Sequence, residues 1–162
     1  MNFSSIWKTR RTVGIAGFLL GVVIWFAPSI FRSKYRDAAR ISEITLERKG
    51  CYGGCPIYKV VFSRDNTATF TGIRYVDRIG AYKSGIDFTR IAQGVNSQGF
   101  FDLRDEYAVG TFDAGVVVTT AVRQGIRKTV TTYDSAAPPL ELWGINAAID
   151  GVVWKATWAK VQ

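Results

Sequence analysis

Histidine is absent from this sequence of 162 residues, and cysteine, methionine and proline are rare, with two, one and four copies. Without imidazole, the chain cannot build a Ser-His-Asp or Cys-His nucleophile, a histidine general base or a histidine metal site. Lysine, carboxylate and tyrosine chemistry stay possible in principle. Because the common catalytic groups are missing, we predict a protein that is not an enzyme and that uses no cofactor or metal.

Acidic residues are scarce at the N-terminal end of the chain. The whole sequence carries a net charge of +8, of which +6 falls in residues 1–40 and only +2 in residues 41–162. A nucleic-acid-binding domain would carry its basic residues in a stripe on the folded part. Here they flank an apolar segment, where anionic lipid head groups attract them. We therefore expect a lipid bilayer as a partner and no nucleic acid.

Residues 12–31 form a run of 20 residues without a charge. As a helix this run is about 30 Å long, which matches the hydrocarbon core of a bilayer. It predicts one transmembrane helix between a basic tail, 1–11, and a basic juxtamembrane linker, 32–40. A cleaved signal peptide, with Ala27 and Ser29 as the small residues, is the alternative. The length and bulk of the apolar run favour a retained anchor.

Three glycines, Gly14, Gly17 and Gly21, share one face of this predicted helix. Small residues at such spacing let two membrane helices approach closely, so we expect the helix to pack on a membrane protein subunit. Chance is the alternative, because glycine is common in membrane helices. The count of basic residues on either side would place the following domain in the cytoplasm. The signal-anchor pattern and the paired cysteines instead favour a tail, 1–11, that stays in the cytoplasm and a domain that is exported.

Residues 41–162 alternate short apolar strands with two helical segments, which predicts an α+β domain made of a small antiparallel sheet with two helices on one face. Asp87 is the predicted N-cap of the first helix, and Gly99 ends it. In the second helix, after Pro139, we expect Leu140, Trp143 and Ala147 to pack inward. The expected strands are 58–62, 67–71, 73–82, 116–122 and 126–132, with another around Ile44 and Leu46.

The two cysteines, Cys51 and Cys55, enclose a loop with two glycines and precede Pro56. Glycine freedom can bring the two Cα atoms within the 4.4–6.8 Å range of a disulfide. Reduced structural thiols and a metal or redox site are the alternatives. The Cys-x-x-x-Cys-Pro pattern is similar to the copper-binding motif of Sco-type copper chaperones, but their distant histidine is missing. A disulfide in an oxidising compartment is the interpretation we favour.

The pattern Cys51-x-Gly53-x-Cys55-Pro56-x-Tyr58 resembles the signature of a bacterial domain family of unknown function that is often carried behind export signals. The similarity covers about residues 42–152. It includes Gly72, Asp113, the stretch Gly125-x-x-Lys128-x-Val130-x-x-Tyr133, and Pro139-Leu140. The resemblance implies an envelope location, so we expect the helix in the bacterial inner membrane and the domain in the periplasm. It brings no activity, substrate or cofactor with it.

These observations together predict a non-catalytic, membrane-anchored accessory subunit that stabilises a larger membrane protein complex. A photosynthetic or respiratory assembly would be a natural host. Trp158, near the C-terminus, is the residue we expect to contact a neighbouring subunit. The alternative is a stand-alone envelope protein that binds a small ligand or a metal through the loop between Cys51 and Cys55.

Overall fold

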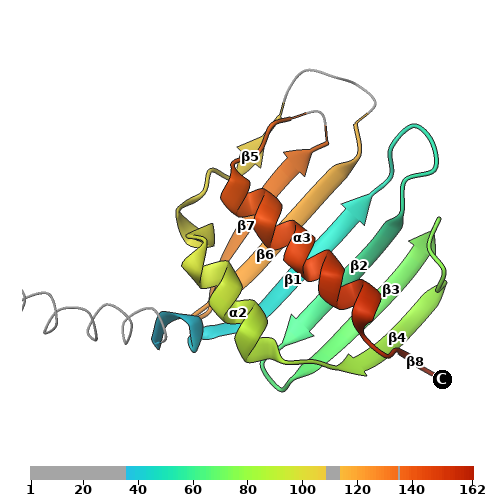
Figure 1. The fold of residues 1–162 in the computed structure, drawn as a ribbon, viewed down its shortest axis with the longest axis horizontal. Helices are drawn as coiled ribbons and strands as arrows, with labels where there is room; N and C mark the ends of the chain where they lie inside the picture. The colour runs from blue at the N-terminus through green and yellow to red at the C-terminus, as the bar shows by residue number, and fades with distance from the viewer. Residues whose placement is uncertain (1–35, 109–113, 135) are drawn as a thin grey trace, which may run out of the picture. The chain divides into compact units, whose positions relative to one another are not determined.

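An eight-stranded sheet dominates the computed structural model, which describes residues 36–108, 114–134 and 136–162 (Figure 1). The strand order is β5-β7-β6-β1-β2-β3-β4-β8. All neighbouring strands are antiparallel except β5 and β7, which are parallel. The strands are β1 Ile41–Lys49, β2 Ile57–Ser63, β3 Thr67–Arg74, β4 Gly80–Gly85, β5 Glu106–Tyr107, β6 Val116–Arg123, β7 Ile126–Tyr133 and β8 Ala159–Lys160.

The predicted fold class, a small antiparallel sheet in an α+β domain behind a transmembrane helix, is wrong. The domain is mostly sheet, and the sheet is larger and mixed. The two edge strands, β5 and β8, have two residues each and are too short to show an alternating pattern. The segment predicted as one strand over 73–82 is instead the end of β3, a turn and the start of β4.

Gly72 explains why this turn forms where it does. A Cβ atom on Gly72 would lie 1.7 Å from the backbone oxygen of Arg78, so only glycine lets the loop fold back over the strand. Tyr75 inside the loop has a φ of 55°, in the left-handed region that reverses the chain direction. The hairpin of β3 and β4 then pairs Gly72 with Gly80.

Two α-helices, α2 (Phe88–Ser97) and α3 (Leu140–Lys155), lie on the same face of the sheet, and a short 3-10 helix, η1 (Phe100–Asp102), follows α2 (Figure 1). The side chain of Asp87 accepts a hydrogen bond from the backbone N–H of Arg90 at 3.1 Å and so caps α2. Gly99, with a φ of 68°, ends the segment. Both helices begin where the sequence predicted.

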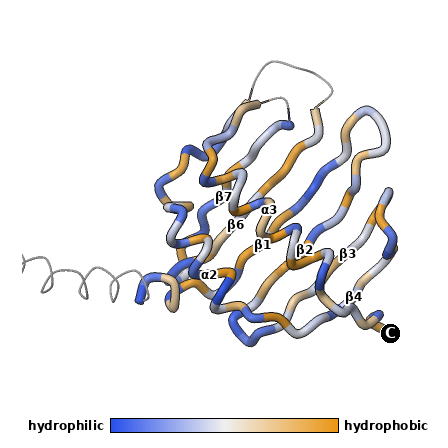
Figure 2. The backbone as a smooth tube through the Cα atoms, viewed as in Figure 1, coloured by the Kyte–Doolittle hydropathy of each residue, from blue (hydrophilic) through white to orange (hydrophobic). Residues whose placement is uncertain are grey.

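The core lies between the sheet and these helices. Its largest fully buried side chains come from β1, β2, β6, β7, η1 and α3, and Figure 2 shows hydrophobic stretches along the central strands under the helices. The helix-facing residues alternate along each strand with residues on the opposite face, as the period of two requires. The buried strand residues include Ile44 and Leu46 on β1 and Tyr58, Val60 and Phe62 on β2. From the helical layer, Phe100 of η1 and Leu142 and Ile149 of α3 are buried against the sheet.

No helix among the described residues is long and apolar enough to cross a membrane. The longest of them, α3, has 16 residues and buries one face against the sheet. The predicted transmembrane helix over 12–31, its glycines Gly14, Gly17 and Gly21, and the tail 1–11 lie outside the described residues. The prediction of a single-pass inner-membrane protein is therefore wrong for the part of the chain that the structure describes.

Candidate interaction surface

The outer face of α3 exposes large apolar side chains. Leu140 is 81% exposed, Trp143 64% and Trp154 50%. On a helix these positions fall on one side, and the residues between them on that side, Ala147 and Gly151, are small. Scattered exposed hydrophobic residues are ordinary, whereas a contiguous apolar row on one helix is a candidate interaction site. We call these five residues the α3 outer face.

The sequence-based expectation for this helix is wrong, because Leu140 and Trp143 point away from the core. The face that packs on the sheet consists of Leu142, Ile145, Ile149 and Val153, all at most 3% exposed. The helix is apolar on both sides, so the 3.6-residue period alone does not tell which side is buried. Hydrogen bonds from polar side chains of α3 to the sheet determine which side of the helix is buried.

The first anchor joins α3 to two strands. Asp150 on α3 accepts hydrogen bonds from the Tyr58 hydroxyl on β2 and from the Arg48 guanidinium on β1. Arg48 Nε also lies 3.3 Å from the Tyr58 hydroxyl oxygen. The Arg48 and Asp150 side chains are 25% and 18% exposed. The three side chains therefore form a partly buried ion pair with a shared hydroxyl, which we call the Asp150 anchor.

The Asp150 anchor raises the pKa values of Tyr58 and Arg48. Burial raises the pKa of Tyr58 well above its ordinary value, and the hydrogen bond to Asp150 raises it further. Burial lowers the pKa of Arg48, but the hydrogen bond and negative charge of Asp150, with the smaller contribution of Tyr58, outweigh burial and raise it overall. Tyr58 therefore stays neutral and donates its hydrogen, and Arg48 stays charged, across the physiological range.

A second anchor lies on the same side of α3. The hydroxyl of Thr119 on β6 donates a hydrogen bond to the side-chain oxygen of Asn146 at 2.7 Å, and both residues are buried. Buried polar groups need such partners, so the pair fixes the helix over β6 as Asp150 fixes it over β1 and β2. Trp154 adds an edge-on ring contact with Tyr58, at a centroid distance of 6.4 Å. Because the Asp150 anchor and the hydrogen bond between Thr119 and Asn146 hold the inner side of α3 on the sheet, the α3 outer face is directed away from the core.

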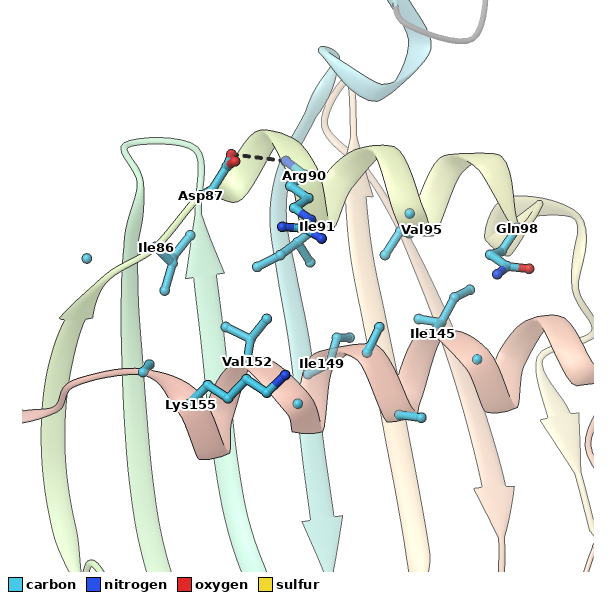
Figure 3. A pocket seen from close by; sticks show the side chains of 17 residues that line it. Ile86, Asp87, Arg90, Ile91, Val95, Gln98, Ile145, Ile149, Val152 and Lys155 are labelled. Carbon is cyan, nitrogen blue, oxygen red and sulfur yellow. Dashed lines mark hydrogen bonds between the residues drawn. The ribbon is translucent and has the colours of Figure 1, made fainter.

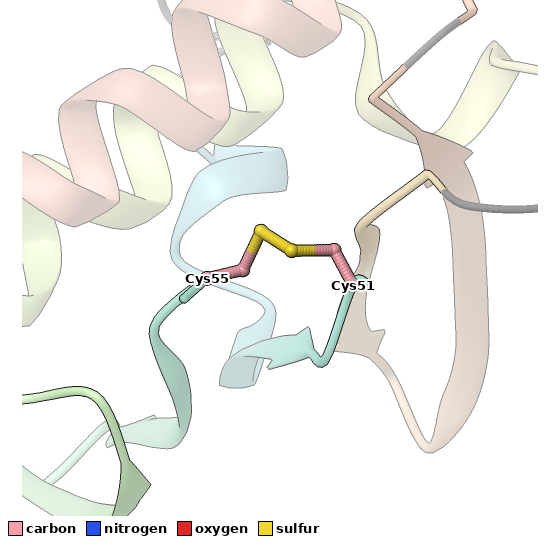
Figure 4. Close-up of a disulfide and its surroundings, with 2 residues drawn as sticks. All are labelled: Cys51 and Cys55. Atoms are coloured by element: carbon pink, nitrogen blue, oxygen red, sulfur yellow. A yellow bond between two sulfur atoms is a disulfide. The ribbon is translucent and has the colours of Figure 1, made fainter. Parts of the chain in front are cut away.

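Cys51 and Cys55 form a disulfide, as predicted (Figure 4). Their Cα atoms are 5.7 Å apart, and Gly53 between them has a φ of 143°, which favours glycine. The loop joins β1 to β2 and carries Tyr52 at 90% exposure. Because both sulfurs are bonded to each other, the loop offers no thiolate ligand. Within the described ranges, no group of three or more Cys, Asp or Glu residues is arranged to hold a metal ion.

Trp158 lies between α3 and the edge strand β8. It is half-buried, its indole N–H donates to the backbone oxygen of Val153 at 2.8 Å, and its ring packs against Phe70 at 5.4 Å. The C-terminal segment around it is not frayed, because β8 pairs with β4. The role of Trp158 as a partner contact stays a prediction. Trp143, by comparison, is more exposed and belongs to the α3 outer face.

Sequence reasoning missed Arg48 and Asp150, the charged members of the Asp150 anchor. Asp150 is a lone carboxylate inside the apolar stretch of residues 145–154, and a lone charge in such a stretch signals a buried partner. Nothing local points to Arg48, which is 102 residues away in sequence.

The fold and the α3 outer face define a sheet domain with one helical layer and an exposed apolar helix. The chain belongs to the family described as Domain of unknown function (DUF6438), which it matches over residues 42–153. This agrees with the resemblance to an uncharacterised family noted from the sequence. A comparison with curated proteins finds no match.

Proposed function

We propose that this domain is a non-catalytic accessory subunit, and that it binds a protein of a larger complex through the α3 outer face. The observation that carries the proposal is the exposure of Leu140, Trp143 and Trp154 on one side of a helix whose other side is anchored. Tryptophan is enriched among the residues that contribute most to protein–protein affinity. The membrane complex suggested as host by the sequence stays a prediction.

The disulfide between Cys51 and Cys55 supports a location outside the cytoplasm, because disulfides persist in oxidising compartments. We extend the proposal accordingly: the Cys51-x-Gly53-x-Cys55-Pro56-x-Tyr58 pattern is the signature of the family, and the domain works in a bacterial envelope. In this interpretation the loop is structural. It leads the chain into β2, where Tyr58 reaches the Asp150 anchor.

A photo-crosslinking experiment in cells tests the binding proposal. A photoreactive phenylalanine analogue at position 140 keeps an apolar group on the α3 outer face, next to Trp143. We expect a discrete adduct with a second protein that weakens strongly in a Trp143→Ser background. The control carries the probe at position 59, an exposed residue on the sheet face opposite the helices. Equal adducts from positions 140 and 59, or an adduct indifferent to Trp143→Ser, would contradict the proposal.

A further inference from the structure

A groove of about 740 Å³ lies between α2 and α3 (Figure 3). This volume falls within the range of about 300–1,000 Å³ that is usual for small-molecule sites. The floor of the groove is apolar and continuous with the core. It is formed by Ile91 and Val95 of α2 and by Ile145, Ile149 and Val152 of α3.

Small residues along both helices leave the space between them unfilled. Gly94 of α2 and Gly144, Ala148 and Gly151 of α3 line the groove. Apart from chain neighbours and the backbone of the same helix, no heavy atom of the described residues lies within 4 Å of a Cβ atom built on Gly94 or Gly151, so close helix packing does not explain these glycines. Each costs up to about 1 kcal/mol of helix stability relative to alanine. An open groove accounts for them.

One end of the groove carries two cations. Arg90 reaches in from α2 and Lys155 from α3, as Figure 3 shows. Among the described residues, neither lies within ion-pair distance of a carboxylate. Asp87 is the one acidic residue in the lining, and its carboxylate accepts the backbone N–H of Arg90 instead. The last turn of α3 favours a cation at Lys155 but does not neutralise it. This end therefore has a net charge of +1.

The groove is long. It follows α3 from Gly144 to Lys155, about 17 Å at 1.5 Å per residue. A flexible, unbranched chain is the shape that fits, with an anionic group at the Arg90 end and hydrocarbon over the isoleucines and valines.

We propose that this groove binds a free long-chain carboxylate, with its hydrocarbon on the apolar floor and its head group between Arg90 and Lys155. Guanidinium and ammonium groups form strong, charge-assisted hydrogen bonds with carboxylates. The groove shares the small residues Ala147 and Gly151 with the α3 outer face, but it uses none of the large side chains Leu140, Trp143 and Trp154 that carry the protein-binding proposal.

Equilibrium dialysis of the full-length chain against radiolabelled palmitate tests this site. We expect saturable binding of one palmitate per chain. Gly94→Leu places a side chain in the open groove and improves the helix propensity of α2, so it should lower the affinity at least tenfold while the fold is retained. Thr89→Leu, on the exposed opposite side of α2, is the matched control and should bind as the unaltered protein does. Circular dichroism verifies that both variants fold.

The charged end is tested in the same assay. Arg90→Gln and Lys155→Gln should each weaken palmitate binding about tenfold, because each removes a charged hydrogen-bond donor. Lys59→Gln, on the opposite sheet face, should change nothing. Methyl palmitate should bind the unaltered protein as weakly as palmitate binds a double variant that carries both Arg90→Gln and Lys155→Gln.

Three results would overturn the inference: equal binding by Gly94→Leu and the unaltered protein, equal affinity for acid and ester, or no saturable binding of palmitate. If Gly94→Leu abolishes the adduct from position 140 while palmitate does not bind, a protein segment occupies the groove instead. Failure of the interaction proposal has a different signature, since it appears in the Trp143→Ser crosslinking experiment and leaves palmitate binding intact.

Discussion

Tyr58 on β2 donates its hydroxyl hydrogen to the carboxylate of Asp150 on α3, and the two residues are 92 apart in the sequence. The tyrosine lies three residues after Cys55, so the contact links the disulfide loop, the centre of the sheet and the helix. Arg48 completes the anchor from β1. Because the anchor fixes which side of α3 faces the sheet, it also determines that Trp143 is exposed.

Asp150→Ala should lower the free energy of unfolding by about 2–3 kcal/mol, because it leaves the Arg48 charge without its partner. The value lies below that for a fully buried pair, since both side chains retain some exposure. Tyr58→Phe, which removes one hydrogen bond and keeps the ring, should cost about 1 kcal/mol. Urea unfolding followed by tryptophan fluorescence measures both. A cost for Asp150→Ala no larger than that for Tyr58→Phe would show that the ion pair contributes nothing.

Alkaline pH should destabilise the protein through Tyr58. The pKa of Tyr58 is raised in the folded state, whereas in the unfolded chain it is about 10. Its contribution is therefore fully present below pH 10 and is lost as the pH rises from there toward the folded pKa, by about 1.4 kcal/mol per pH unit. Comparing urea unfolding of the protein and of Tyr58→Phe between pH 8 and 11 isolates this effect from other groups. Parallel pH profiles for the two proteins would rule it out.

The parts of the fold that were predictable are those with local signals. The hairpin of β6 and β7 turns at Gln124 and Gly125, whose positive φ values of 54° and 80° suit such residues. Asp87 is a local signal for the start of α2, and the glycines between Cys51 and Cys55 are a local signal for the disulfide loop. Strands β5 and β8 have no local signal, because they exist only through pairing with distant partners.

For the candidate site, the sequence located α3 but assigned its faces incorrectly. An apolar helix can bury either side, and the choice depends on Asp150 and Asn146, whose partners on the sheet are remote in sequence. The groove depends on the separation of α2 and α3, which no local pattern encodes. The N-terminal segment, by contrast, has a strong local signal. Its hydropathy predicted a membrane span, and the segment lies outside the described residues.

Replacing both Cys51 and Cys55 by serine should cost about 2 kcal/mol of stability, the chain-entropy value for a loop of about five residues. Thermal unfolding without reductant measures the difference. The unaltered protein treated with reductant should approach the stability of the double variant, which serves as the matched control. Free alkylation of both cysteines in the folded, unreduced protein would contradict the bond itself.

The final prediction asks which side of α3 is free, since both proposals depend on it. Trp143→Ser should change the free energy of unfolding by no more than about 0.5 kcal/mol, because the side chain is exposed. Ile149→Ala, six residues further on and fully buried, should cost about 2–5 kcal/mol through lost packing and a cavity. The same urea titration measures both variants, and Trp143→Ser should also bind less of a dye that reports exposed apolar surface. A large cost at Trp143 together with a small one at Ile149 would mean that the helix is rotated, with Leu140, Trp143 and Ala147 inward. In that case the α3 outer face would not exist, and the partner would have to bind elsewhere on the domain.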